Sequence, residues 1–228
     1  ATKMGVVRIG ELCARFGADV ITDAFAAILN RATVELTRSI AALPDGVSEA
    51  VGHMDDDGVE HDRPVKFAVT ITVAGDAITF DFSGSDRQAK GPVNLRPSMV
   101  EACVFYSLIG CLDPDLVFND GMREAVKFIY APNTITNASP PAPVSSYQKA
   151  NLKLVDVILE AMSHFRPDRA VANAGSSGAL LISWLGGGRP GRGGQTAGSN
   201  GHKFWAALTC CKGLLLNVVP QRTAQSSS

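Results

Sequence analysis

The chain has 228 residues, of which 46% are hydrophobic and 19% are charged, as is typical of globular proteins. That length is enough for one well-packed domain or for part of a larger one. The 21 lysine and arginine residues nearly balance the 22 aspartate and glutamate residues, and they form no basic run of the kind that nucleic-acid-binding proteins carry. No apolar run has the length of a membrane-spanning helix, and the N-terminus has no signal-peptide pattern. We therefore expect a cytoplasmic protein without membrane contacts.

The cysteines indicate neither a disulfide framework nor a zinc site, because they form an odd set without C-x-x-C spacing: Cys13, Cys103, Cys111, Cys210 and Cys211. Two of them, Cys103 and Cys111, fall in an apolar helical pattern, where thiols usually act as small hydrophobic side chains.

The first predicted element is a long helix from Asp19 to Leu43. Its apolar residues recur at intervals of three and four and form one stripe: Ile21, Phe25, Ile28, Ala32, Leu36 and Ile40. Pro44-Asp45-Gly46 ends the helix. We expect it to pack across a sheet and to have a structural role.

An acidic segment, Asp55-Asp56-Asp57-Gly58, lies between His53 and His61. Carboxylates and imidazoles suit Mn²⁺, Zn²⁺ or Mg²⁺, so this segment is a candidate metal cluster. However, three adjacent aspartates point in different directions, and no EF-hand pattern is present. We interpret the segment as a solvated turn before a strand.

A β-hairpin follows. Val65, Phe67, Val69, Ile71 and Val73 alternate with smaller or polar residues, which predicts a half-buried strand. Ala74-Gly75-Asp76 turns the chain, and Ile78, Phe80 and Phe82 continue the alternation in the second arm.

The loop that leaves the hairpin is rich in polar residues and glycines. Its acceptors and hydroxyls include Asp81, Ser83, Ser85, Asp86 and Asn94, which we take as candidate residues of a substrate cleft. Within it, Gly84 and Gly91 permit backbone angles or close approaches that a Cβ would obstruct. The alternative interpretation is that the loop only reverses the chain, with Asp and Ser bonded to nearby backbone amides.

A second polar loop follows a helix. Ser98 and Glu101 form a capping box for that helix, which runs through Phe105 and Leu112 and ends at Asp113-Pro114. The loop itself contains Asp113, Asp115, Asn119 and Asp120. If the sheet places it beside the first loop, the two loops could jointly bind a polar ring, and we add Asp115 and Asn119 to the cleft candidates. Ordinary turn chemistry explains the same residues equally well.

The remaining predicted elements complete an α+β fold. Residues 125–131 alternate as a third strand, and residues 132–146 carry four prolines and form an extended, stiff arm. A second long amphipathic helix follows, with a stripe of Leu152, Val155, Leu159 and Met162. The fold class is therefore an antiparallel, hairpin-containing sheet packed by long amphipathic helices.

The last part of the chain differs in composition. Residues 186–194 are rich in glycine and arginine, a composition that predicts a mobile loop. A phosphate-binding loop is not indicated, because the G-x-x-x-x-G-K-[ST] pattern is absent. An apolar stretch at 214–219 could form a buried strand or helix. None of the four histidines has a partnering motif, and no G-x-S-x-G elbow exists, so a serine hydrolase is not indicated. No catalytic residue is assigned.

Several ordered motifs resemble the hydantoinase B family, which includes B subunits of ATP-dependent hydantoinases, the matching half of 5-oxoprolinase and, more distantly, the acetone carboxylase alpha subunit. FDFSGSDRQAKGPVN at 80–94 and LDPDLVFNDG at 112–121 carry the resemblance most strongly. Other motifs agree in order: ELCARFG at 11–17, LPDG at 43–46, DDDG at 55–58, YAPNTITNASPPAPV at 130–144 and NLKLVDVILEAM at 151–162. The resemblance covers roughly residues 8 to 180.

The resemblance implies a hydrolase of C–N bonds in cyclic amides. An A-type subunit would bind ATP and phosphorylate the ring oxygen, and the B component would hydrolyse the activated ring with a divalent metal, Mn²⁺ or Zn²⁺. The metal motifs of the family precede the region represented here, and the chain begins with Ala1. We therefore expect residues 1–185 to form a partial hydantoinase B domain, followed by a divergent tail at 186–228. We also expect this fragment to hold no cofactor and to be inactive alone.

Three hypotheses follow. The first is a fragment of an ATP-dependent hydrolase of hydantoin, N-methylhydantoin, 5-oxoproline or another lactam, in a hetero-oligomer with an A-type subunit. The second is an acetone carboxylase alpha-like subunit. The third is a non-catalytic structural or subunit-docking domain. In the first, the loop from Asp81 to Asn94 would be a supporting wall of the cleft.

Overall fold

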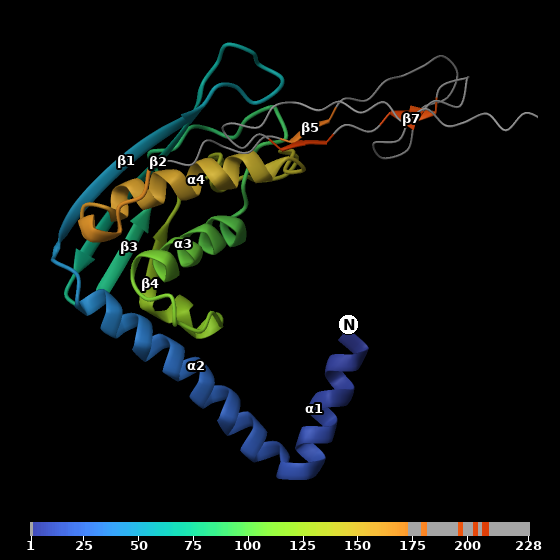
Figure 1. The fold of residues 1–228 in the computed structure, drawn as a ribbon, viewed down its shortest axis with the longest axis vertical. Coiled ribbons are helices and arrows are strands. Elements are labelled where there is room, and N and C mark those ends of the chain that lie inside the picture. The colour runs from blue at the N-terminus through green and yellow to red at the C-terminus, as the bar shows by residue number, and fades with distance from the viewer. Residues whose placement is uncertain (1, 173–178, 182–195, 198–202, 205–206, 210–228) are drawn as a thin grey trace, which may run out of the picture. The chain divides into compact units, whose positions relative to one another are not determined.

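A computed structural model describes residues 2–172, 179–181, 196–197, 203–204 and 207–209 (Figure 1). The chain divides into two units, Ala1–Asn173 and Ala174–Ser228. In the second unit, β5 (Ala179–Leu181) pairs antiparallel with β8 (Ala207–Thr209), and β6 (Thr196–Ala197) pairs antiparallel with β7 (Lys203–Phe204). The predicted glycine-rich loop at 186–194, the apolar stretch at 214–219 and the boundary after residue 185 lie outside the described residues.

The first unit is built on a four-stranded mixed sheet in the order β1-β2-β3-β4. The strands are β1 (Gly46–Met54), β2 (Val65–Ala74), β3 (Ala77–Asp81) and β4 (Val126–Ile129). Neighbours pair antiparallel except β3 and β4, which are parallel, so the predicted antiparallel pairing holds for β1 to β3 and not for β4. The predicted hairpin is confirmed by β2 and β3, whose alternating apolar side chains all lie in the core. The third predicted strand is confirmed by β4.

Strand β1 was not predicted from the sequence. Most of its inward-facing residues are small, Met54 at its end being the exception, and Gly52 is so close to α4 that a Cβ would lie 2.5 Å from Val157 Cγ2. The apolar residues Val47 and Val51 are at least half exposed. The strand therefore lacks the inward hydrophobic alternation by which strands are recognised, and the small residues instead let helix α4 approach the sheet.

Two helices pack against each other and cover the sheet (Figure 1): α3 (Pro97–Cys111) and α4 (Tyr147–Met162), of which α4 contacts β1 and β2. The predicted stripe of α4 is confirmed in part, because Met162 is fully buried and Val155 and Leu159 pack against the core. Leu152 is 41% exposed, whereas Leu154, Val157 and Ile158 are fully enclosed. The buried face of α4 is therefore centred nearer to residues such as Val157, which lies beside Gly52 of β1.

The predicted capping box of α3 is wrong. The helix begins at Pro97 after the N-cap residue Arg96, which makes no side-chain cap, and Ser98 lies inside the first turn. Proline is suited to the first helical position because its fixed φ matches the helix and its missing N–H needs no partner there.

The N-terminal region contains α1 (Thr2–Phe16) and α2 (Ala18–Ala41). Only the second half of the predicted α2 stripe is buried, at Ala32, Leu36 and Ile40, whereas Phe25 and Ile28 are exposed. Helix α2 contacts β3 and the short 3₁₀ helix η1 (Asp120–Ala125), so its packing role is confirmed for that half alone. A second 3₁₀ turn, η2 (Pro167–Arg169), follows α4. None of the described helices is both long and apolar enough to span a membrane.

The junction of α2 and η1 predicts a specific sensitivity to mutation. A Cβ on Gly121 would lie 2.1 Å from the carbonyl oxygen of Leu29, and the Gly121 carbonyl already accepts a hydrogen bond from Thr33 Oγ1 at 2.6 Å. We expect Gly121→Ala to lower the free energy of unfolding by about 2 kcal/mol, because backbone must move. Urea denaturation followed by circular dichroism measures the change.

The matched control is Gly110→Ala in α3, where nothing lies within 4 Å of the added Cβ. This substitution should be neutral or should stabilise the protein by up to about 1 kcal/mol, since alanine favours helix more than glycine does. Equal effects of the two substitutions would contradict the tight contact between α2 and η1.

Candidate functional site

The loop after β3 uses side chains to continue the sheet beyond the end of the strand. Ser85 Oγ accepts a hydrogen bond from the Ala68 N–H at 3.0 Å and donates one to the Ala68 carbonyl at 3.1 Å. Asp86 N–H donates to the Lys66 carbonyl at 3.0 Å, and its Oδ2 accepts from the Lys66 N–H at 2.9 Å. Both residues thus bond to the free edge of β2 as a paired strand would.

Asn94 closes the other end of this loop and has no exposed surface. Its Oδ1 accepts from the Ala89 N–H at 2.7 Å, and its Nδ2 donates to the carbonyls of Ala89, Gly91 and Pro143 at 3.0, 3.1 and 2.9 Å. An enclosed amide with all these partners holds residues 89–94 in a compact turn and joins them to the proline-rich arm.

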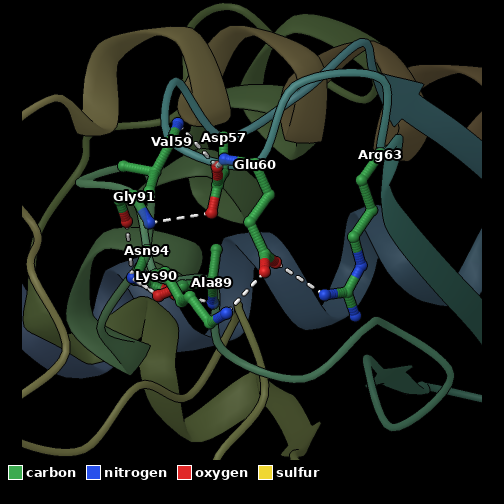
Figure 2. Close-up of polar contacts among 8 residues, drawn as sticks. All are labelled: Asp57, Val59, Glu60, Arg63, Ala89, Lys90, Gly91 and Asn94. Carbon is green, nitrogen blue, oxygen red and sulfur yellow. Dashed lines mark hydrogen bonds and ion pairs between the residues drawn. The ribbon is translucent and has the colours of Figure 1, made fainter.

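Asp57 joins this turn to the acidic segment on the other side of the cleft (Figure 2). Its side chain is only 3% exposed. Oδ1 accepts from the N–H groups of Val59 at 2.8 Å and Glu60 at 2.7 Å, and Oδ2 accepts from the Gly91 N–H at 2.8 Å. Burial acts to raise the pKa of Asp57, but the backbone N–H groups, chiefly those of Glu60 and Gly91, outweigh it and hold the pKa below its usual 3.8.

The prediction of a solvated turn at 55–58 is therefore wrong for Asp57, although Asp55 is exposed. Backbone donors offset the desolvation of the carboxylate, and this could not be read from three consecutive aspartates. The predicted close approach at Gly91 is confirmed, since a Cβ there would lie 1.8 Å from the Asp57 carbonyl oxygen.

The proline-rich arm forms backbone hydrogen bonds with the loop. As predicted, residues 132–146 contain neither a helix nor a regular strand. The Gln88 N–H donates to the Asn133 carbonyl at 2.9 Å, the Ile135 N–H donates to the Asp86 carbonyl at 2.9 Å, and the Leu95 N–H donates to the Ile135 carbonyl at 2.7 Å. These bonds fix the loop on a second side.

A cleft of about 330 Å³ lies between the segment 57–65 and the segment 86–90. Six charged residues line it: Asp57, Glu60, Arg63, Asp86, Arg87 and Lys90. Glu60 Oε1 accepts from Lys90 Nζ at 2.5 Å and Oε2 accepts from an Arg63 guanidinium nitrogen at 2.6 Å, which connects the two segments (Figure 2). The hydrogen bond from Lys90 is the main cause of a lowered pKa at Glu60, and Arg63 adds to it against the effect of burial.

The structure distributes the first set of predicted cleft residues over different environments. Asp86 lines the cleft. Asp81 Oδ1 accepts the Ser83 N–H at 2.8 Å at the end of β3, and Ser83 is exposed. Ser85 and Asn94 are buried and bonded to backbone. Their hydrogen bonds show that these residues shape the loop. Contact with a substrate stays a prediction for all of them.

The second polar loop does not join this site. Because β3 and β4 are parallel, the loop after β3 and the segment before β4 belong to opposite ends of the sheet. The Asp115 N–H donates to Asp113 Oδ1 at 2.9 Å in a local turn. Asn119 caps η1 by accepting the Gly121 N–H at 2.9 Å, and it lines a separate pocket against α2. Joint binding of a ring by the two loops is not supported.

The sequence reasoning missed the cations of the cleft, Arg63, Arg87 and Lys90. A usable signal was present in the hairpin itself. The residues that precede the first arm and those that follow the second arm of an antiparallel hairpin lie at the same end of the sheet. Charged residues at 60–63 and 86–90 were therefore bound to be neighbours.

Within the described ranges, no group of three or more His, Cys, Asp or Glu side chains is arranged to hold a metal ion. In the acidic segment, His61 Nδ1 lies 3.5 Å from Asp56 Oδ2, which is a pair of side chains and not a set of three metal ligands. Burial raises the pKa of the Cys103 thiol to about 12, which agrees with its predicted role as a small hydrophobic side chain.

Replacement of Asp57 by asparagine is expected to lower the free energy of unfolding by about 2 kcal/mol. The amide oxygen can still accept from Val59 and Glu60, but the amide NH₂ then faces the Gly91 N–H, which leaves two donors opposed. Chemical denaturation measures the loss. The control Asp55→Asn changes an exposed neighbour and should stay within about 0.5 kcal/mol of wild type.

The same pair of proteins tests the pKa of Asp57. Because its pKa in the folded protein lies below 3.8, its contribution to stability is complete above that value and is lost as the pH falls through the folded pKa. The stability difference between wild type and Asp57→Asn should be constant from about pH 5 to 7 and should shrink below about pH 4. A difference that grows on acidification would show that the pKa is raised.

The fold is shared with solved structures of low sequence identity. An ATP-dependent caprolactamase from Pseudomonas jessenii aligns with 73% of this chain and 29% of its own, at 21% identity and a TM-score of 0.65. A nucleotide-free acetone carboxylase aligns with 71% of this chain and 23% of its own, at 19% identity and a TM-score of 0.62. The α+β class is thereby confirmed.

Curated relatives are longer than this chain. An uncharacterized protein of Methanocaldococcus jannaschii is 30% identical over 186 residues, which are 81% of this chain and 32% of the relative. The 5-oxoprolinase PfmaA of Pestalotiopsis fici is 27% identical over 83% of this chain and 14% of its own length. An acetophenone carboxylase delta subunit of Aromatoleum aromaticum is 28% identical over 60% of this chain and 20% of its own.

The profile of the Hydantoinase B/oxoprolinase family matches residues 1–214. This match spans nearly the whole chain and includes the motifs at 80–94 and 112–121 on which the resemblance rested. The chain belongs to the Hydantoinase B/oxoprolinase family.

Proposed function

We propose that this chain is part of the B subunit of an ATP-dependent cyclic amide hydrolase that opens hydantoin, 5-oxoproline or another lactam. The observation that carries the proposal is the family match over residues 1–214. Two of the similar proteins, a 5-oxoprolinase and an ATP-dependent caprolactamase, are named for lactams, which are cyclic amides. The proposed reaction is therefore hydrolysis of a ring C–N bond.

A cyclic amide resists water because resonance delocalises the nitrogen lone pair into the carbonyl. Phosphorylation of the ring oxygen removes that resistance, and we assign this step to an A-type ATP-binding subunit in a cytoplasmic hetero-oligomer. ATP with Mg²⁺ and a divalent metal, Mn²⁺ or Zn²⁺, belong to the parent complex in this proposal. The described residues offer no set of metal ligands that fits such an ion, so no step here uses one.

The contribution of the described residues would be to bind and orient polar groups of the substrate. The cleft has rigid walls because Asp57, Ser85 and Asn94 bond to backbone on both sides of it. Its exposed side chains, Arg63 and Lys90, can donate hydrogen bonds to carbonyl, carboxylate or phosphoryl oxygens. This geometry supports a binding wall and assigns no nucleophile.

The second candidate is an acetone carboxylase alpha-like subunit. It is favoured by the similarity to an acetophenone carboxylase delta subunit and by the fold shared with acetone carboxylase. A non-catalytic docking domain is the third candidate. The reactions differ, because carboxylation of acetone or acetophenone adds a carboxyl group to a ketone, whereas a lactam hydrolase opens a ring with water.

The test is to express the full-length parent with its A-type subunit and to follow ATP-dependent ring opening of hydantoin, 5-oxoproline and caprolactam by chromatography. Opening of at least one ring that requires ATP is the expected result. Turnover of acetone or acetophenone with bicarbonate, and of no ring, would reject the hydrolase in favour of the carboxylase. No turnover in either assay would leave the docking domain.

In that complex, we expect Arg63→Ala and Lys90→Ala each to lower kcat/KM for the ring roughly tenfold, as loss of one charged hydrogen bond to substrate does. Both side chains are 72% exposed, and exposed ion pairs add little to stability, so the fold should be unaffected. The matched control is Arg8→Ala, which removes an exposed arginine paired with Glu11 on α1. Equal kcat/KM values for all three variants would show that the cleft takes no part in the reaction.

A further inference from the structure

The charges of the cleft are sorted by depth. The carboxylates are recessed: Asp57 is 3% exposed, the Glu60 side chain is 29% exposed, and Asp86 is partly buried. The cations face outward, with the side chains of Arg63 and Lys90 each 72% exposed. Arg87 is exposed as well. The lining is neutral in sum, but a molecule that enters from solvent meets positive charge first.

We propose that this cleft binds a small oxyanion group, a phosphoryl group or a carboxylate, through Arg63, Arg87 and Lys90. The proposal deepens the proposed function and rests on it for the identity of the molecule that carries the anion. Arginine and lysine are the side chains that bind these groups most strongly, and arginine does so through paired N–H donors. A volume of about 330 Å³ is enough for such a group and a small ring.

Arg87 is the cation best placed to take the anion first. Among the residues that the structure describes, no side-chain hydrogen bond or ion pair engages its guanidinium, although it lines the cleft. Its backbone is fixed by a bridge to Thr134 in the proline-rich arm. The bridge fixes the backbone of Arg87 at the cleft, and among the described residues no ion pair has to be broken before its guanidinium can bind an anion.

Glu60 occupies the position between Arg63 and Lys90 that an incoming oxyanion would take. Its carboxylate bonds to both of them and stays ionised, because the hydrogen bond from Lys90 lowers its pKa. Exposed ion pairs are weak, so a ligand oxyanion can exchange with Glu60 at small cost. Glu60 therefore keeps the two cations in place in the free protein and competes with the ligand.

The rigid base of the cleft makes this arrangement a built site. Lys90 precedes Gly91, whose N–H is held by Asp57, and the Ala89 N–H is held by Asn94 (Figure 2). Glu60 follows Val59, and its own N–H is held by Asp57 as well. The two sides of the cleft thus share one buried carboxylate, which fixes the spacing of Glu60 and Lys90.

The test titrates the whole 228-residue chain, labelled with ¹⁵N-arginine, with inorganic phosphate and separately with acetate at constant ionic strength. Side-chain Nε–H resonances report binding. We expect saturable shifts, a roughly tenfold weaker affinity in Arg87→Ala and a roughly fivefold stronger affinity in Glu60→Gln, which removes the competing charge. Arg8→Ala, an exposed arginine on α1, is the control and should bind as wild type does.

The two probes distinguish the sources of the anion. Tighter binding of phosphate assigns the cleft to a phosphoryl group, and tighter binding of acetate assigns it to a carboxylate. Linear shifts without saturation, or Arg87→Ala behaving as wild type does, would overturn the site. Because the titration needs neither ATP nor a partner, phosphate binding in a protein whose complex opens no ring would reject the proposed function and keep the site.

Discussion

The buried carboxylate of Asp57 is the interaction on which the end of the sheet depends. It takes hydrogen bonds from two backbone N–H groups of its own segment and from one in the loop after β3. Burial of an unpaired carboxylate costs several kcal/mol, whereas each hydrogen bond to a charged group returns about 1.5 to 3 kcal/mol. Three such bonds offset the cost, and only glycine at position 91 lets the backbones come close enough to form them.

The site has two layers with different tasks. Asp57, Ser85 and Asn94 lie inside and bond to backbone, where they replace the ladder that a regular strand would provide. Arg63, Arg87 and Lys90 lie outside on the frame that results. The polar residues of this site are therefore divided between shaping a loop and presenting charge, and their burial distinguishes the two roles.

Much of the fold could be predicted from sequence patterns that are compatible with only one secondary structure. The alternation of Val65 to Val73 has no helical equivalent, so the hairpin was predicted correctly. Strand β1 was not predicted because most of its inward side chains are small. The buried face of α4 was predicted only in part, because two of its faces carry leucine and valine. The capping box failed since Pro97 starts the helix one residue before Ser98. Local sequence cannot decide which face of α4 is buried, because packing against β1 decides it.

The candidate site could be predicted only in part, for a related reason. The loop from Asp81 to Asn94 was recognised in the sequence by its polar residues. In the structure, the polar side chains of Ser85 and Asn94 form hydrogen bonds to the backbone. The cations were overlooked because charged residues near strand ends are common on any surface. Their significance depends on the distance between segments 30 residues apart, as at Glu60 and Lys90.

The measurement that tests this account most directly is native-state hydrogen exchange at the Gly91 amide. If Asp57 holds that N–H in a buried bond, its protection should approach that of core amides in β2 such as Val69, although Gly91 belongs to a loop. The exposed turn residue Asp76 provides the scale for an unprotected amide. Exchange of Gly91 as fast as that of Asp76 would contradict the central role of Asp57.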